Sequence, residues 1–299
     1  MMVVRSPFNY NFQINNGKVM KQFFKYILAA VVAIMVQNTL AQTHQLEKLW
    51  ETDTVVRVPE SVLPDLKKGV LFVSEIEGNP NAVDGKGGVA KIGLDGKIIN
   101  LDFTTGLNAP KGLGHFGNEL YAADLSEVVV IDINTGKVKN KIVVDSAKAL
   151  NDITVNDKGI VYVSDSKTKK IHRIENGKVS TFLTNVGGVN GLKAVGADLY
   201  ILGGQKFMKS DSQGNLTQVA MLSCGGDGIE PVGNGDFLIT CWSGHIYYVT
   251  AAGKIETLLD IQEKKVNTAD LAYDNVKHIL YVPTFWGNKV MAYKLITTK

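Results

Sequence analysis

Short apolar runs of alternating or β-branched residues recur along the chain, each bounded by Gly, Asn or Asp. The first of them cover residues 69–74, 88–92 and 97–101, and Asn176-Gly177 separates two later runs in the manner of a two-residue hairpin turn. Such runs are typical of short antiparallel strands joined by tight turns. The pattern therefore predicts an all-β protein.

A small motif recurs ahead of these groups of strands: usually a polar residue, then usually Gly, then an aliphatic residue. Its six copies are Glu60-Ser61-Val62, Lys111-Gly112-Leu113, Asn151-Asp152-Ile153, Asn190-Gly191-Leu192, Asp227-Gly228-Ile229 and Ala269-Asp270-Leu271. Their first members lie 51, 40, 39, 37 and 42 residues apart. A period of about 40 residues with strand-like content is the spacing of propeller blades, each a four-stranded sheet. The repeat predicts a six-bladed β-propeller.

The last repeat is one strand short, because only the runs 279–282 and 289–295 precede the end of the chain. A separate apolar run, which contains Leu46 and Trp50, precedes the first repeat, although Glu47 and Lys48 interrupt its alternation. An N-terminal strand that completes the last blade would close the ring and remove exposed sheet edges. We assign this role to residues 48–52.

The first 41 residues have the layout of a signal peptide rather than of a blade. A basic segment starts at Met20, an apolar run follows over residues 26–36, and Thr39-Leu40-Ala41 supplies small residues for cleavage. The run is shorter than the roughly 20 residues of an ordinary membrane span. We expect translation to start at Met20, cleavage after Ala41 and a periplasmic or extracellular protein from residue 42 onward. An uncleaved N-terminal anchor is the alternative.

Export changes the charge balance of the chain. The formal charge of +3 includes four basic and no acidic residues among the first 41, which leaves −1 for residues 42–299. This balance does not indicate a surface for nucleic acid. We expect one monomeric propeller domain over residues 42–299, with a small-molecule substrate and without a stable membrane span after processing.

Cys224 and Cys241 are the only cysteines. If residues 232–236 form a hairpin turn, the flanking antiparallel strands bring position 241 close to position 224. A disulfide and two buried free thiols are both compatible with this geometry. Neither cysteine is expected to act as a nucleophile, because no histidine occupies the repeated motif position.

The innermost strand of each propeller blade lines the central channel, so equivalent residues of different blades face one another across it. The first members of the six motifs are Glu60, Lys111, Asn151, Asn190, Asp227 and Ala269. Carboxylate and carboxamide oxygens suit Ca²⁺, suit Mg²⁺ or Mn²⁺ less well, and argue against Zn²⁺. These first motif residues predict a metal site formed by Glu60, Asn151, Asn190 and Asp227.

These motifs resemble those of the senescence-marker-protein/gluconolactonase/luciferin-regenerating-enzyme-like family. The resemblance rests on Glu60-Ser61 followed by residues 69–74, on Asn151-Asp152, on Asn190-Gly191-Leu192 and on Asp227-Gly228. The arrangement of the repeats is also similar to that of diisopropyl fluorophosphatase and the paraoxonases. The resemblance extends over residues 42–299, although each motif is short. The resemblance implies a six-bladed propeller with a divalent metal in its channel, commonly Ca²⁺ and in some members Zn²⁺.

The resemblance also implies roles for individual residues. Glu60, Asn190 and Asp227 look like core metal ligands, and Asn151 like an amide that binds metal or substrate. Members of the family hydrolyse lactones or organophosphates, with the metal polarising the substrate oxygen. Asp227 would then be a general base toward water, or a nucleophile.

Two of the six first motif residues have no side-chain oxygen that could bind a metal. The Lys111 ammonium either orients an anionic substrate and stabilises oxyanion charge, or pairs with Glu60 or Asp227 in a metal-free protein. Ala269 contributes no ligand, and its neighbour Asp270 lies one residue out of register and is expected only behind the ligands.

Other polar residues have simpler interpretations. Asp152 is expected to accept hydrogen bonds at the start of a strand, with a second base as the alternative. Glu230 is expected to be a carboxylate at a sheet edge, and the alternative is that it faces the channel. The loop over residues 77–86 either covers one mouth of the channel or is a tolerated insertion. Structural or solvated roles are expected for His115, His172, His245 and His278.

The sequence leaves two functions open. The first is an exported metal-dependent hydrolase of lactone-like or related ester substrates. The second is a non-catalytic propeller that binds a small molecule or a protein partner, since propellers serve both purposes.

Overall fold

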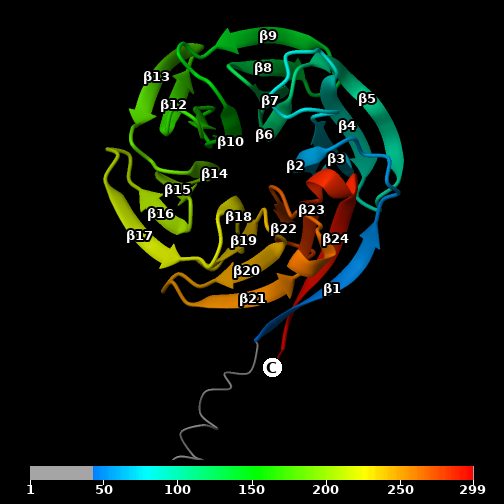
Figure 1. Ribbon diagram of the computed structural model, residues 1–299, viewed down its shortest axis with the longest axis vertical. Helices are drawn as coiled ribbons and strands as arrows, with labels where there is room; N and C mark the ends of the chain where they lie inside the picture. Colours follow the sequence, from blue (N-terminus) through cyan, green and yellow to red (C-terminus); the bar gives the residue numbers. More distant parts are fainter. Residues whose placement is uncertain (1–42, 299) are drawn as a thin grey trace, which may run out of the picture. The chain divides into compact units, whose positions relative to one another are not determined.

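The computed structural model describes residues 43–298, so the predicted start at Met20, the signal peptide and the cleavage after Ala41 lie outside the described residues. The strands of the described chain form six antiparallel four-stranded sheets arranged around an axis (Figure 1). This confirms the predicted six-bladed β-propeller. None of the helical segments from residue 43 to residue 298 is long and apolar enough to cross a membrane.

Each of the first five blades takes four consecutive strands, ordered from the axis outward (Figure 1). The strands are β2 (Pro59–Asp65), β3 (Val70–Glu75), β4 (Gly87–Gly93) and β5 (Ile98–Leu107); β6 (Pro110–Phe116), β7 (Glu119–Asp124), β8 (Glu127–Asp132) and β9 (Val138–Val143); β10 (Leu150–Val155), β11 (Val161–Asp165), β12 (Lys170–Glu175) and β13 (Lys178–Leu183); β14 (Val189–Val195), β15 (Asp198–Gly203), β16 (Lys206–Ser210) and β17 (Leu216–Met221); and β18 (Gly226–Pro231), β19 (Phe237–Cys241), β20 (His245–Val249) and β21 (Ile255–Asp260).

The sixth blade joins the two ends of the described chain. It consists of β22 (Ala272–Asp274), β23 (Ile279–Pro283), β24 (Val290–Thr297) and, outermost, β1 (His44–Glu51), with the short 3₁₀ turns η1 (Gln262–Lys264) and η2 (Phe285–Gly287) nearby in sequence. Strand β1 pairs antiparallel with β24, and its register shifts between Lys48 and Trp50. This bulge explains the imperfect alternation seen in the sequence. The closing strand is confirmed, and it runs over residues 44–51 rather than 48–52.

The hydrophobic core lies between neighbouring blades. Phe72 and Val89 of the first blade pack with Leu120 and Val129 of the second, and comparable clusters join other adjacent blades. Each such side chain contributes roughly 1.5–3 kcal/mol when fully buried. Because the apolar residues fill the spaces between sheets, the axis is left to the polar residues of the innermost strands.

Neighbouring innermost strands approach each other closely where the motif has glycine. A Cβ atom on Gly191 would lie 2.1 Å from the Asp227 carbonyl oxygen, and one on Gly112 would lie 2.5 Å from the Ile153 nitrogen. In the first five blades, the pairing of the innermost strand with the next one also shifts register across the motif. The repeated glycine is therefore required by strand packing around the channel.

Cys224 and Cys241 form a disulfide with a Cα–Cα distance of 6.1 Å. The turn at residues 232–236 is present, since the Val232 N–H donates to the Asp236 carbonyl oxygen at 2.8 Å. It makes β18 and β19 antiparallel and sets Gly226 opposite Cys241. The structure thus selects the disulfide from the two alternatives that the sequence left open.

Candidate functional site

Five motif residues occupy the same place in five successive blades. Each is the second residue of its innermost strand. We call this set the axial ring; it consists of Glu60, Lys111, Asn151, Asn190 and Asp227. Ala269 precedes β22 and is fully buried.

Two oxygen atoms of the axial ring are buried without a hydrogen-bond partner in the described part of the chain: Glu60 Oε2 and Asn151 Oδ1. An unsatisfied buried acceptor costs about 1–3 kcal/mol, and more when it is charged. Native proteins keep such atoms rare, and they are often explained by an ion, a ligand or a water molecule. Both atoms belong to residues that the sequence predicts as metal ligands.

The two ring amides are held through their nitrogen atoms. Asn190 Nδ2 donates to Asp227 Oδ1 at 2.7 Å. Asn151 Nδ2 donates to Ser166 Oγ at 3.1 Å, and Ser166 Oγ in turn donates to the Val189 carbonyl oxygen at 2.7 Å. Because the donors are engaged, each amide retains its oxygen for another partner. This is the orientation in which an amide serves as a cation ligand.

The ring carboxylates lie in mutual electrostatic range and away from water. Glu60 is only 6 % exposed and Asp227 only 4 %. Burial raises the pKa of Glu60 well above its usual value, and the nearby charges of Asp227 and Asp270 raise it further. Burial and the charge of Asp270 raise the pKa of Asp227 to about 7, against the hydrogen bond from Asn190. A cation would relieve this repulsion and favour the ionised carboxylates.

Lys111 connects the axial ring to the long loop at residues 77–86. Its Nζ donates to the Pro80 carbonyl oxygen at 3.1 Å. Burial lowers the pKa of Lys111, although the charges of Glu60 and Asp124 oppose this effect. No ion pair of the described residues joins Lys111 to Glu60 or Asp227, so the structure does not form the pairing considered for a metal-free protein. The contact places one part of the loop beside the ring.

The second position of the motif links neighbouring blades by hydrogen bonds. Ser61 Oγ donates to Asp270 Oδ2 at 2.6 Å and accepts from the Leu113 N–H at 3.3 Å. Asp152 accepts from the Leu192 N–H of the next blade at 2.6 Å, which fits the role expected for it. The charge of Asp270 raises the pKa of both Glu60 and Asp227.

A cavity of about 270 Å³ lies among later residues of the innermost strands, and Asp152 and Asp270 line it together with Lys193 and Glu230. Lys193 Nζ and Glu230 Oε1 form an ion pair at 2.7 Å. Glu230 belongs to β18, the edge strand of its sheet, and it also lines this cavity, so both alternatives from the sequence apply to it. Both residues lie three positions after a ring member, so extending the motif alignment by three residues would have found them.

Among the described residues, the axial ring does not form part of a metal-binding group of His, Cys, Asp and Glu side chains. In the chain from residue 43 to residue 298, no group of three or more His, Cys, Asp and Glu side chains could hold a metal ion. A cation at the ring would therefore depend on mixed ligation by two carboxylates and two amides. This donor set fits Ca²⁺ better than Zn²⁺.

Comparison with known proteins identifies the fold. Neither a protein-family model nor a curated protein matches the chain. Among solved structures, a catalytically inactive variant of virginiamycin B lyase from Staphylococcus aureus with quinupristin is similar, with 17 % identity, a TM-score of 0.60 and coverage of 85 % of this chain and 100 % of the lyase. A second structure of that lyase has 17 % identity, a TM-score of 0.62 and the same coverage. A streptogramin B lyase has 12 % identity, a TM-score of 0.63 and coverage of 85 % and 98 %.

These similarities extend over nearly the whole length of the lyases and support the six-bladed propeller fold. Identities of 12–17 % do not assign the chain to a family or transfer an activity to it. The senescence-marker-protein resemblance and the metal site remain predictions from the residues.

The buried carboxylates predict a pH dependence of the metal-free protein. The pKa values of Asp227 and Asp270 are both raised to about 7, above the usual value of 3.8. The folded state therefore holds protons that the unfolded chain releases between about pH 4 and pH 7, and the stability from these groups falls as the pH rises through that window. In chelator, we expect the free energy of unfolding to fall by a few kcal/mol from pH 5 to pH 8.

Urea unfolding in chelator at several pH values measures this fall. The same titration of Asp227→Asn should show a shallower decrease, whereas Asp157→Asn, on an exposed turn, should behave as the wild type. Stability that is constant or rises between pH 5 and pH 8 would contradict the buried, protonated carboxylates.

Proposed function

We propose that the chain is a divalent-cation-dependent hydrolase of lactone-like or related ester substrates, with the cation held by Glu60, Asn151, Asn190 and Asp227. The unpartnered, buried oxygens of Glu60 and Asn151 carry the proposal. Ca²⁺ fits this donor set best, and Mg²⁺, Mn²⁺ and Zn²⁺ are the alternatives.

The ring residues suit ester hydrolysis. Asp227 has a pKa of about 7 in the metal-free ring, is positioned by the Asn190 amide, and would accept a proton from an attacking water or attack the substrate itself. Lys111 and Asn151 would bind the substrate, with Lys111 releasing the Pro80 carbonyl oxygen to stabilise oxyanion charge. A bound cation would supply Lewis-acid polarisation of the substrate carbonyl.

Two further observations support this assignment. The similar solved structures are named as lyases, so enzymes occur on this fold. The Cys224–Cys241 disulfide is typical of proteins in oxidising compartments. We therefore propose that the enzyme is exported to the periplasm or the cell exterior and acts there as a monomer.

A non-catalytic binding propeller is the second candidate. The cavity of about 270 Å³ lined by Lys193 and Glu230 favours it, because it presents both charges to a small ligand without involving the axial ring. A small molecule held there would need no cation.

The hydrolase proposal predicts stabilisation by Ca²⁺. At about 100-fold excess over its dissociation constant, Ca²⁺ should stabilise the fold by about 2.7 kcal/mol, because it binds the folded ring only. This corresponds to a rise of roughly 5–10 °C in the unfolding temperature of a chain of this size. Thermal unfolding of the chelated and the Ca²⁺-loaded protein measures it, and a screen of lactones and aryl esters under both conditions tests the reaction.

Glu60→Gln should lose the response to Ca²⁺, whereas Glu263→Gln, at an exposed position, should retain it. The hydrolase proposal would be contradicted if divalent cations and chelator left the unfolding temperature of the wild-type protein unchanged and no ester were hydrolysed. This result would favour the binding propeller.

A further inference from the structure

The surroundings of the Cys224–Cys241 disulfide differ sharply between its two sulfur atoms. Cys241 belongs to β19 and is fully buried. Cys224 lies in the connection from β17 to β18, is only partly buried, and is flanked by the exposed residues Ser223 and Gly225. A reagent in solution therefore reaches the disulfide from the Cys224 side.

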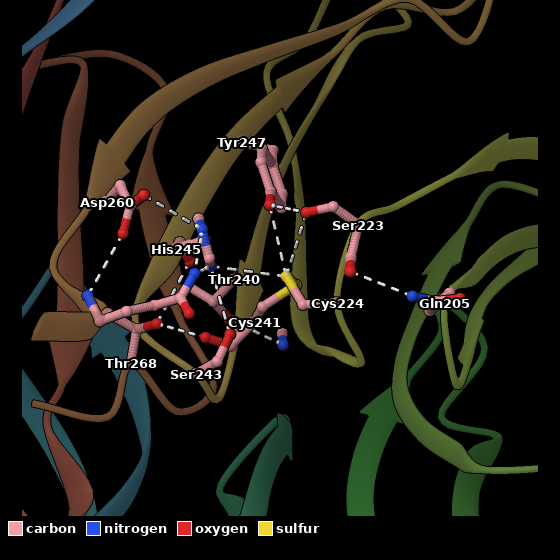
Figure 2. The surroundings of a disulfide bond; sticks show 12 residues. Gln205, Ser223, Cys224, Thr240, Cys241, Ser243, His245, Tyr247, Asp260 and Thr268 are labelled. Carbon is pink, nitrogen blue, oxygen red and sulfur yellow. Dashed lines mark hydrogen bonds and ion pairs between the residues drawn. A yellow bond between two sulfur atoms is a disulfide. The ribbon is translucent and has the colours of Figure 1, made fainter. Parts of the chain in front are cut away.

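Three polar groups surround the Cys224 sulfur (Figure 2). Tyr247 Oη lies 3.3 Å from it, His245 Nδ1 lies 3.6 Å from it, and Ser223 Oγ lies 3.9 Å from it. A neutral disulfide sulfur is a weak acceptor and gains little from such groups, whereas a thiolate is stabilised by hydroxyl donors and by a neighbouring imidazolium. The surroundings of Cys224 therefore suit the reduced, ionised sulfur.

The imidazole of His245 is held in a defined position beside this sulfur. Its Nε2 lies 3.5 Å from Asp260 Oδ2 and 2.6 Å from the Gln262 amide nitrogen. Its ring stacks on Tyr247 with a centroid distance of 5.4 Å and an interplanar angle of 14°. The contacts at the far nitrogen and the stacked ring fix the orientation of the imidazole, so that Nδ1 faces the sulfur. Ser243 Oγ also reaches Nδ1, at 3.2 Å, and shares that nitrogen with Cys224.

The histidine beside Cys224 does not belong to the repeated motif. The sequence predicts a structural or solvated role for His245 and no nucleophilic cysteine, because no histidine occupies the motif position. The histidine comes instead from β20, where it lies directly opposite Cys241 in the strand pairing. Only the pairing of β19 with β20 places it there.

We propose that Cys224 and Cys241 form a thiol–disulfide exchange site for small dithiols, with Cys224 as the attacked sulfur and Cys241 as the buried partner. A thiolate of the dithiol forms a bond to Cys224 Sγ, and the bond between the two cysteine sulfurs breaks with its electron pair passing to Cys241, which takes up a proton. The second thiolate of the dithiol then attacks the dithiol sulfur bound to Cys224, and Cys224 leaves as a thiolate stabilised by His245 and Tyr247.

The products are two reduced cysteines and a cyclic disulfide, so the dithiol is oxidised by two electrons and the protein is reduced by two. The exchange uses none of the axial-ring residues, and it stands whether or not the hydrolase proposal holds.

The first test uses the wild-type protein and dithiothreitol without denaturant. Alkylation followed by mass spectrometry counts the reduced cysteines, and circular dichroism monitors the fold. We expect complete reduction while the propeller stays folded. A disulfide that resists reduction until the protein unfolds would show a purely structural bond and overturn the proposal, and this test requires no variant to fold.

The second test measures each thiol alone with 5,5′-dithiobis(2-nitrobenzoate) at pH 7. Cys224 in the Cys241→Ser variant should react at least about 10-fold faster than Cys241 in the Cys224→Ser variant. Adding His245→Gln to the Cys241→Ser variant should slow the reaction of Cys224 about 10-fold, because the stabilisation of its thiolate is lost. His278→Gln, at an exposed histidine, is the matched control and should change nothing. Equal rates for the two thiols, or a rate unaffected by His245→Gln, would refute the assigned roles.

Discussion

Asp227→Asn is expected to abolish ester hydrolysis while making the metal-free propeller more stable at pH 8. The buried carboxylate is ionised at that pH against burial and against the charge of Asp270, and the amide removes this cost. The retained oxygen can still accept the hydrogen bond from Asn190. We expect hydrolysis to fall by about 10²–10⁴-fold, as for loss of a general base, and the free energy of unfolding in chelator to rise by at least about 1 kcal/mol.

Hydrolysis assays and urea unfolding, both with and without Ca²⁺, separate these effects. Asp157→Asn serves as the control, because Asp157 lies on the exposed turn between β10 and β11, outside the axial ring. A variant that keeps its activity would remove Asp227 from the chemistry, even if the cation still binds. A variant that loses activity and is also destabilised in chelator would indicate a structural role instead.

Trp50→Ala is expected to weaken the closure of the propeller. Trp50 packs against the cluster that contains Tyr281 and Val62, and its Nε1 donates to the Leu94 carbonyl oxygen at 3.1 Å. The side chain therefore ties β1 to the last blade and to the first blade at once. Truncation of a buried Trp costs about 3–5 kcal/mol, and a value near the lower end is expected here because Trp50 is only partly buried.

Thermal and urea unfolding measure the loss. Leu49→Ala is the matched control on the same strand, since Leu49 is 44 % exposed and should cost little. Deletion of residues 44–51 should have a larger effect, because it exposes the edge of β24 and should cause unfolding or association, visible by size-exclusion chromatography. A deleted protein that remains monomeric with unchanged stability would contradict the closing role of β1.

The packing between the blades stabilises the fold, whereas the buried carboxylates of the proposed site destabilise it. Packing between the blades supplies the hydrophobic stabilisation, whereas the ring buries carboxylates whose pKa values are raised by burial. The metal-free protein should therefore be least stable at the pH values where the ring is ready to bind a cation. Buried groups that destabilise a fold are typical of functional sites.

The sequence by itself determined the six blades, the closing strand and the ring positions. These features follow from local periodicity and from a repeat of about 40 residues, because equivalent residues of repeated units must occupy equivalent places around an axis. The repeat therefore places Glu60, Asn151, Asn190 and Asp227 at equivalent positions around the axis.

Only the tertiary structure decided which atoms at these places lack partners and which groups meet from different strands. The free oxygen of Asn151 depends on Ser166, and the pairing of Lys193 with Glu230 depends on the spacing of two blades. His245 reaches Cys224 only because β20 pairs with β19. Such contacts join residues far apart in the chain, and a hydrogen bond tolerates differences in distance of only a few tenths of an ångström, which no local sequence pattern encodes.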